Sequence, residues 1–377
     1  MIPLLAADAP ILNAFGKLPD PRKSRNQTYP LIDIISVAMI GVLCAANDWV
    51  SVVKWAMHNQ EWFQSVGLCL NGIPSHDTIG RFFRLVNPKL FEECFRMWTQ
   101  ELSQKIQGII AIDGKTIRNS GDSFQGTKPH HIVTAFAAEN DIILGQLKTD
   151  EKSNEITAIP ELLNTLVLKD CIVTIDAMGC QKEIAAKIVT QEGDYVLGLK
   201  GNQGTFHDEV ANFFEQVMAV TPEEAGCTYA KSIEKEHGRI ETREVWATTN
   251  VEWLPMLQEW PSLHSLVCVK STRESKGKVS CEIRFYISSL RAQAERIGQA
   301  IRLHWGIENK VHWHLDVTFN EDKSKIRAGY GPENFSLLKR CVLNLVKMDD
   351  TRKESVTQKR REAAYSTAYR LHLLGVK

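Results

Sequence analysis

Two aspartates in this sequence follow short apolar runs that have the character of buried strands. Residues 109–112 (IIAI) lead into Asp113 and Gly114, and residues 172–175 (IVTI) lead into Asp176. Ligands of open α/β sheets gather at strand ends, so the two carboxylates could share one site. Adjacent carboxylates repel each other unless a cation lies between them, and hard oxygen ligands suit Mg²⁺ or Mn²⁺. Each aspartate taken alone could instead start a loop or cap a helix.

A site for two metal ions usually needs a third carboxylate, and Glu308 is the candidate. It lies in a segment with a helical pattern, residues 292–316, in which Leu303, Ile307 and Val311 share one apolar face. Glu308 directly follows Ile307 and therefore lies at the edge of that face, where its side chain can reach a cleft. An ordinary solvated glutamate is the alternative.

The same part of the chain offers competing ligands. Three other carboxylates could take the place of Glu308, namely Asp316, Glu321 and Asp322. Three histidines raise the alternative of a zinc site, namely His304, His312 and His314. The zinc alternative fits poorly, because His312 and His314 are two residues apart and point to different faces of a helix.

Basic residues at several places could contact DNA. Arg81 and Arg84 lie on a short amphipathic segment with Ser75 as its N-cap, which suits a helix-turn-helix recognition element. Contacts to the DNA backbone give affinity rather than sequence reading. Solvated surface charges are the alternative for each of these residues. The further candidates are Lys115 and Arg118 after the first aspartate, Lys200 after a strand, and His237, Arg239 and Arg243, which alternate along one strand face.

Composition indicates an ordinary globular protein. The chain has 377 residues, of which 44% are hydrophobic and 24% charged, and its formal net charge is zero. That length suits two or three domains. The nine cysteines contain no CxxC pair, which is typical of a reduced, intracellular protein. The apolar residues 31–50 carry two aspartates, so a buried helix is expected there rather than a membrane span, and a cytoplasmic location is expected.

The order of elements predicts an α/β protein. Residues 1–104 have an all-helical pattern, and residues 105–200 read as strand, strand, strand, helix, strand, helix, strand, with a hairpin turn at Asn140 and Asp141. A β-rich insertion is expected over residues 201–285. The remaining segments are residues 286–345, with the helix of Glu308, and a charged helical tail over residues 346–377.

Several motifs resemble one family, the DDE transposases of bacterial insertion sequences, in the branch that includes the H-repeat-associated proteins. The motifs are IDGKTIR, KSNEITAIPELL, TIDAMGCQ, LGLKGNQ, HGRIETR, YISSL and HWGIENKVHWHLDVTFNED, with LPDPRKSRNQTYPL and PSHDTIGRFFR in the helical region. The resemblance implies a ribonuclease-H-like core with a late β insertion and the triad Asp113, Asp176 and Glu308 as catalytic metal ligands. It also implies Mg²⁺, for which Mn²⁺ can substitute, and double-stranded DNA bound by a homodimer on paired element ends.

The sequence departs from the wider class around the third acid. Trp305, Ile307 and Glu308 keep the expected core, but Ile301, His304 and Leu315 stand where the class has tyrosine, arginine and lysine. Arg302, His304 or Lys310 are candidate replacements. The function expected is cleavage and joining of DNA strands by two-metal phosphoryl transfer. The alternatives are a DNA-binding protein without catalysis and a nuclease that does not join strands.

Overall fold

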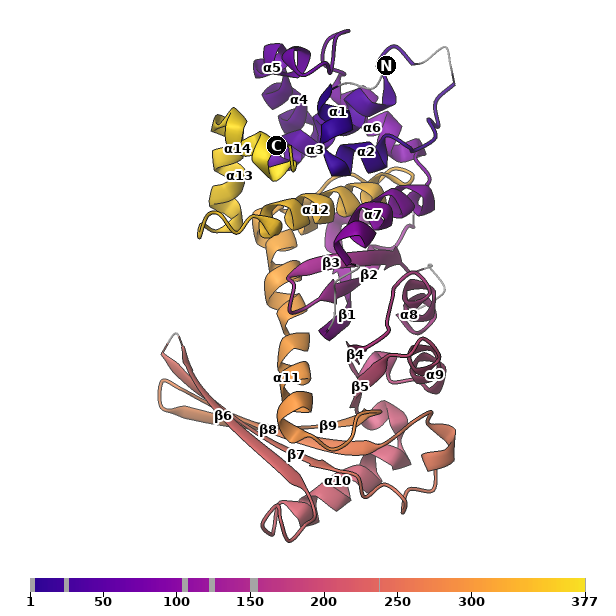
Figure 1. The fold of residues 1–377 in the computed structure, drawn as a ribbon, viewed down its shortest axis with the longest axis vertical. Helices are drawn as coiled ribbons and strands as arrows, with labels where there is room; N and C mark the ends of the chain where they lie inside the picture. The colour runs from indigo at the N-terminus through magenta and orange to yellow at the C-terminus, as the bar shows by residue number, and fades with distance from the viewer. Residues whose placement is uncertain are drawn as a thin grey trace.

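The computed structural model describes residues 4–23, 27–103, 108–121, 126–149, 155–236 and 238–376. Helices from both ends of the chain pack together at one end of the molecule, the sheet lies in the middle, and a long β arm extends from the opposite end (Figure 1). The helices of the N-terminal region are α1 (Leu4–Asp8), α2 (Pro10–Phe15), α3 (Leu31–Leu43), α4 (Trp49–His58), α5 (Gln60–Ser65), α6 (His76–Leu85) and α7 (Pro88–Ser103).

Helix α3 fills the centre of the helical region. Nearly all of its side chains are buried, and Asp33 is only 3% exposed. This confirms the expected buried helix. Among the described residues, no helix combines the length and hydropathy that crossing a bilayer requires.

In the described residues, nine strands form one continuous sheet in the order β3-β2-β1-β4-β5-β9-β8-β7-β6. Strands β1, β2 and β3 are antiparallel neighbours, whereas β4 and β5 run parallel to β1, which confirms the expected mixed sheet. The strands are β1 (Gly108–Ile117), β2 (His130–Ala137), β3 (Ile142–Lys148), β4 (Cys171–Ile175), β5 (Asp194–Leu199), β6 (Thr228–Glu236), β7 (Arg239–Thr248), β8 (Ser265–Ser275) and β9 (Lys278–Ser288).

Helices cover both faces of the sheet. One face packs on α8 (Glu155–Leu163), α9 (Lys182–Thr190) and α10 (Thr205–Val217). The other face packs on α11 (Ala294–His304) and shares a core with the helical region. Alternate residues of each strand therefore point into different cores, as a period of two requires. In β1, Ile109 and Ala111 face α11, whereas Ile110 and Ile112 face α8.

The predicted insertion is an extension of the same sheet. Residues 285–288 of β9 pair with residues 196–199 of β5, so hydrogen bonding runs without a break from the core into the arm. The two-residue turn between β8 and β9 has positive φ at Lys276 and Gly277, the conformation that suits a tight hairpin. The β signals of this region are confirmed, but strand β6 and helix α10 were not anticipated.

The charged tail is helical as predicted, but several of its charges are buried in the helical region. Helices α12 (Gly331–Met348), α13 (Val356–Tyr365) and α14 (Thr367–Leu373) return the chain to α3 and α4. Arg360 is 2% exposed and donates to the carbonyl of Val42, and Arg370 lies over the rings of Trp55 and Trp62. These guanidinium groups are buried within the helical region and stabilise its packing, and they do not lie on the surface.

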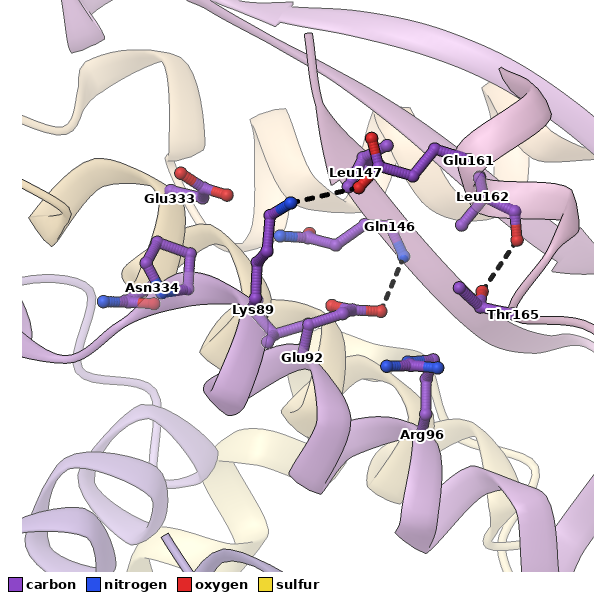
Figure 2. A pocket seen from close by; sticks show the side chains of 12 residues that line it. Lys89, Glu92, Arg96, Gln146, Leu147, Glu161, Leu162, Thr165, Glu333 and Asn334 are labelled. Atoms are coloured by element: carbon purple, nitrogen blue, oxygen red, sulfur yellow. Dashed lines mark hydrogen bonds and ion pairs between the residues drawn. The ribbon is translucent and has the colours of Figure 1, made fainter. Parts of the chain in front are cut away.

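The outer edge of the sheet, at β3, is closed by polar side chains from two helices. Glu92 of α7 accepts a hydrogen bond from the backbone N–H of Gln146 at 3.0 Å, and Asn344 of α12 bonds both backbone groups of Ile143. Figure 2 shows Glu92 pointing toward Gln146 from α7, with Arg96 beside it. Burial raises the pKa of Glu92 to about 8. Covering an edge in this way prevents pairing with another chain.

Candidate active site

The register of the sheet brings the two predicted aspartates side by side. The parallel ladder between β1 and β4 ends at the pair Ile112 and Ile175, and Asp113 and Asp176 are the next residue on each strand. Asp176 follows the end of β4 as predicted. Asp113 does not end its strand, because β1 continues to Ile117 while it pairs with β2.

Both aspartates lie on the sheet face that α11 covers. Asp113 lies two positions after Ala111, which packs in the core of that face, so the two side chains point to the same side of the sheet. Asp176 lies two positions after Thr174 and points to the same face. Oγ1 of Thr174 lies 3.0 Å from Nδ1 of His304 at the end of α11. An Oδ1 atom of Asp176 also accepts a hydrogen bond from Met178 N and caps a short 3₁₀ turn, so the capping role and a site role coexist.

Glu308 lies on the helical continuation of α11. The chain continues through π-helical segments over Glu308–His312 and His314–Thr318. Ile307 and Val311 are fully buried, which confirms the apolar face, and Glu308 is exposed beside it. Stretches of π-helix are rare in proteins, and those that occur are frequently found at functional sites.

The charges of nearby carboxylates contribute to a raised pKa at Asp113. Its pKa is raised to about 7, first by burial and then by the charges of Glu155, Asp176 and Glu308, against a lowering hydrogen bond from the backbone of Gly114. The ring of His312 lies beside it, with Nδ1 3.5 Å from Oδ2 of Asp113. Burial lowers the pKa of His312 to about 3, so this ring is neutral and cannot cancel the negative charge.

Glu155 was not among the predicted site residues. It begins α8 on the opposite face of the sheet, where its carboxylate bonds Nε2 of His131 at 2.6 Å. A Cβ on Gly114 would lie 2.1 Å from Glu155 Oε1, so a larger residue after Asp113 would have to displace the Glu155 carboxylate. The acidic first turn of α8 was visible in the sequence, but its proximity to Asp113 depends on the tertiary fold.

The donor atoms suit a divalent cation, although the three acids are not gathered tightly. Asp113 and Asp176 present hard oxygen ligands from adjacent positions, and the charge of Glu308 reaches Asp113. In the described part of the chain, no three His, Cys, Asp or Glu side chains are close enough to hold one ion together.

The competing carboxylates belong to a separate cluster around Lys115. Nζ of Lys115 lies 2.7 Å from Asp316, 3.2 Å from Asp322 and 3.6 Å from Glu321. Arg340 of α12 lies 3.2 Å from Glu321, and Arg118 lies 3.2 Å from Asp322. Lys115 is 8% exposed and surrounded by acids, which is not the setting of a phosphate contact.

The other predicted DNA contacts lie on the surface. Arg81 and Arg84 are exposed on α6, with Ser75 as the N-cap, and Lys200 is exposed after β5. The connection between α5 and α6 spans residues 66–75, longer than the turn of a helix-turn-helix unit. DNA contact by these residues stays a prediction, and His237 lies outside the described residues.

A groove of about 880 Å³ separates the β arm from α11. The guanidinium of Arg284 lies 4.4 Å from the ring centroid of Trp305, which precedes Glu308 by less than one turn. Glu234 forms ion pairs with Arg243 and Arg302 in the wall of the groove. Glu241 forms ion pairs with Arg243 and Arg239, which lie on the same face of β7. The arginines that line the groove are Arg243, Arg273, Arg284 and Arg302.

Comparison with known proteins assigns the chain to one family. Residues 104–345 match the family described as Transposase DDE domain, and residues 12–99 match the family described as DDE_Tnp_1-associated. The chain belongs to the DDE transposases. Its sheet is accordingly the ribonuclease-H-like core of that family, extended by the β arm and preceded by the helical region.

Relatives in Escherichia coli cover nearly the whole transposase chain. The protein named "Putative transposase YncI" of strain O157:H7 is 41% identical over 95% of this chain and 93% of its own length. The protein named "H repeat-associated putative transposase YhhI" of strain K12 is 39% identical over 93% of this chain and 94% of its own length. Among solved structures, a piggyBac transposase synaptic complex with hairpin DNA aligns over 98% of this chain and 78% of that chain, at 11% identity and a TM-score of 0.43.

The structure accounts for two of the departures around the third acid of this transposase. Leu315 is fully buried in the core, so its position cannot present a charged group to DNA. His304 bonds Thr174, and Arg302 forms an ion pair with Glu234 at 3.1 Å. Both side chains are committed to contacts within the protein.

Proposed function

We propose that this transposase cleaves and joins DNA strands at the ends of an insertion sequence by metal-dependent phosphoryl transfer. The observation that carries the proposal is the placement of Asp113 and Asp176 at adjacent positions of one sheet face, with the charges of Asp176 and Glu308 helping to raise the pKa of Asp113. Uncompensated carboxylates on one face are the setting in which divalent cations bind.

In this proposal Asp113 and Asp176 hold the metal and Glu308 completes the site. Two Mg²⁺ or Mn²⁺ ions bound there would supply activation of a water or a 3′-hydroxyl and stabilisation of the leaving oxygen. The neutral ring of His312 contacts Asp113 and adds no positive charge to the site. Arg243, Arg273 and Arg284, which line the groove, bind the DNA backbone and keep the scissile strand close to Glu308.

The partners and the setting follow from the same proposal. The substrate is double-stranded DNA, at the element ends and at the target, and a homodimer holds two paired ends. A cytoplasmic setting agrees with nine cysteines that form no disulfide among the described residues, seven of them buried.

The test is nicking of supercoiled plasmid in Mn²⁺ by the wild type, Asp176→Ala and Glu308→Ala. Glu192→Ala is the matched control, because it removes a carboxylate from an exposed surface pair with Lys169. We expect cutting by the wild type and the control, and at least a ~10³-fold loss in both site variants. Equal cutting by all four proteins would contradict the triad. Cleaved products without joined ones would indicate a nuclease, and tight DNA binding without cleavage would favour the non-catalytic alternative.

A further inference from the structure

Two residues next to the paired aspartates connect their strands to the helix of Glu308. Thr174 precedes Asp176 by two positions and Lys115 follows Asp113 by two, so the period of a strand puts both on the face that α11 covers. Each of them contacts the helix that carries Glu308, one before Glu308 and one after it.

The first contact lies one helical turn before Glu308. Oγ1 of Thr174, which is 2% exposed, lies 3.0 Å from Nδ1 of His304. Burial lowers the pKa of His304 to about 4, so the ring is neutral and shares a single hydrogen bond with the hydroxyl. A buried hydrogen bond of this kind is costly to break on one side only.

The second contact lies beyond Glu308. Nζ of Lys115 lies 2.7 Å from Oδ1 of Asp316, and its other two carboxylate partners follow in the next turn. One of those, Glu321, accepts a hydrogen bond from Ser336 and pairs with Arg340, both on α12. The contact therefore ties β1, the end of the Glu308 helix and α12 together.

The segment between the two contacts is π-helical. Residues Glu308–His312 and His314–Thr318 are both π-helical, and the N–H of Trp313 bonds the carbonyl of Glu308. Because π-helical turns are rare and occur mostly as single turns within α-helices, contacts at the two ends of the segment bear on the position of Glu308.

We propose that Thr174–His304 and Lys115–Asp316 are positioning contacts that hold Glu308 against the strands of Asp113 and Asp176. None of the four side chains needs to touch DNA or metal. Their role in catalysis rests on the proposed function, whereas their role in fixing the helix does not.

The test uses Thr174→Val, which removes only the hydroxyl, and Asp316→Ala, with Asp316→Asn as the conservative variant that keeps an oxygen acceptor for Lys115. Lys359→Met is the matched control, because it breaks another buried lysine–aspartate pair, in which Nζ of Lys359 lies 3.3 Å from Asp349. Amide hydrogen exchange over residues 308–318 and the Mn²⁺ concentration for half-maximal nicking are measured on the full chain.

We expect faster exchange over residues 308–318 in Thr174→Val and Asp316→Ala, and a rise of about tenfold or more in the Mn²⁺ requirement. DNA affinity should stay within about twofold, and Asp316→Asn should recover most of the loss. The control should lose stability but keep the wild-type exchange of this segment and its Mn²⁺ requirement. Exchange over residues 308–318 that is unchanged in both variants would overturn the proposal. If the wild type does not cut DNA, the proposed function fails, and the exchange rates alone still decide between the two outcomes.

Discussion

The fold contains two groups of three carboxylates, and the groups differ in how their negative charge is compensated. The open trio, Asp113, Asp176 and Glu308, has a neutral histidine beside it. The paired cluster, Asp316, Glu321 and Asp322, surrounds Lys115 and is backed by Arg340 and Arg118.

The difference appears in the titration of the most buried member of each group. Burial alone would raise the pKa of Glu321, but the charges of Arg340, Lys339 and Lys115 outweigh it and lower that pKa. Burial and neighbouring carboxylates instead raise the pKa of Asp113 to about 7. The carboxylates of the paired cluster are neutralised by lysine and arginine side chains of the protein. The open trio instead has the electrostatics of a site that binds a cation from solution.

The largest effect is expected from Glu321→Ala, in the paired cluster. It leaves Arg340, which is fully buried, and Lys115 without their shared partner, so the free energy of unfolding should fall by about 3–5 kcal/mol. Urea denaturation measures this. A loss below about 1 kcal/mol would show that the cluster does not stabilise the fold, and the surface variant Glu192→Ala sets the background.

The opposite sign is expected from Asp113→Asn, in the open trio. In chelator the substitution removes one of several repelling charges, so the free energy of unfolding should rise by about 1–2 kcal/mol. In excess Mn²⁺ the wild type should gain stability that the variant does not. Destabilisation in chelator similar to that of Glu321→Ala would erase the distinction between the two groups.

Glu92 sharpens the comparison, because it is a buried acid outside both groups. Its pKa is about 8 in the folded protein and 4.5 as a free group, so the folded state binds the extra proton between these values. Stability should therefore fall as pH rises from about 5 to 8, and less so in Glu92→Gln. The variant should match the wild type near pH 5 and exceed it by about 1–3 kcal/mol at pH 8. Parallel pH curves in thermal denaturation would refute this.

The smallest effect is expected at the β arm. Arg239→Ala removes one candidate phosphate contact, so the slope of log binding constant against log salt concentration should fall by about one unit. Binding to a plain DNA duplex measured over a range of salt concentrations tests this. An unchanged slope would assign Arg239 to its ion pair with Glu241 alone.

The sequence predicted the elements whose pattern is local. The run at residues 172–175 and the apolar face of Ile307 and Val311 are confirmed, because each pattern reflects burial on one face. Strand β6 was missed because much of it is exposed, so its sequence, TYAKSIEKE, has no clear alternation. The end of β1 was misplaced because Asp113 and Gly114 resemble a turn, while pairing with β2 carries the strand further.

The relations around the site depend on distant parts of the chain. Lys115 was read as a DNA contact, but its partners at residues 316–322 are about two hundred positions later. Glu155 lies near Asp113 only because α8 covers the opposite face of β1. The residue types indicated metal chemistry, whereas the pairing of charges could be decided only in three dimensions.

Mn²⁺ binding in the absence of DNA tests the central claim most directly. Electron paramagnetic resonance titration would compare the wild type with Asp113→Asn and Asp176→Asn, with Glu192→Gln as the surface control. The account predicts binding by the wild type and the control, weakened by about tenfold or more in both aspartate variants. Equal Mn²⁺ affinity in all four proteins would contradict the assignment of the open trio as the metal site.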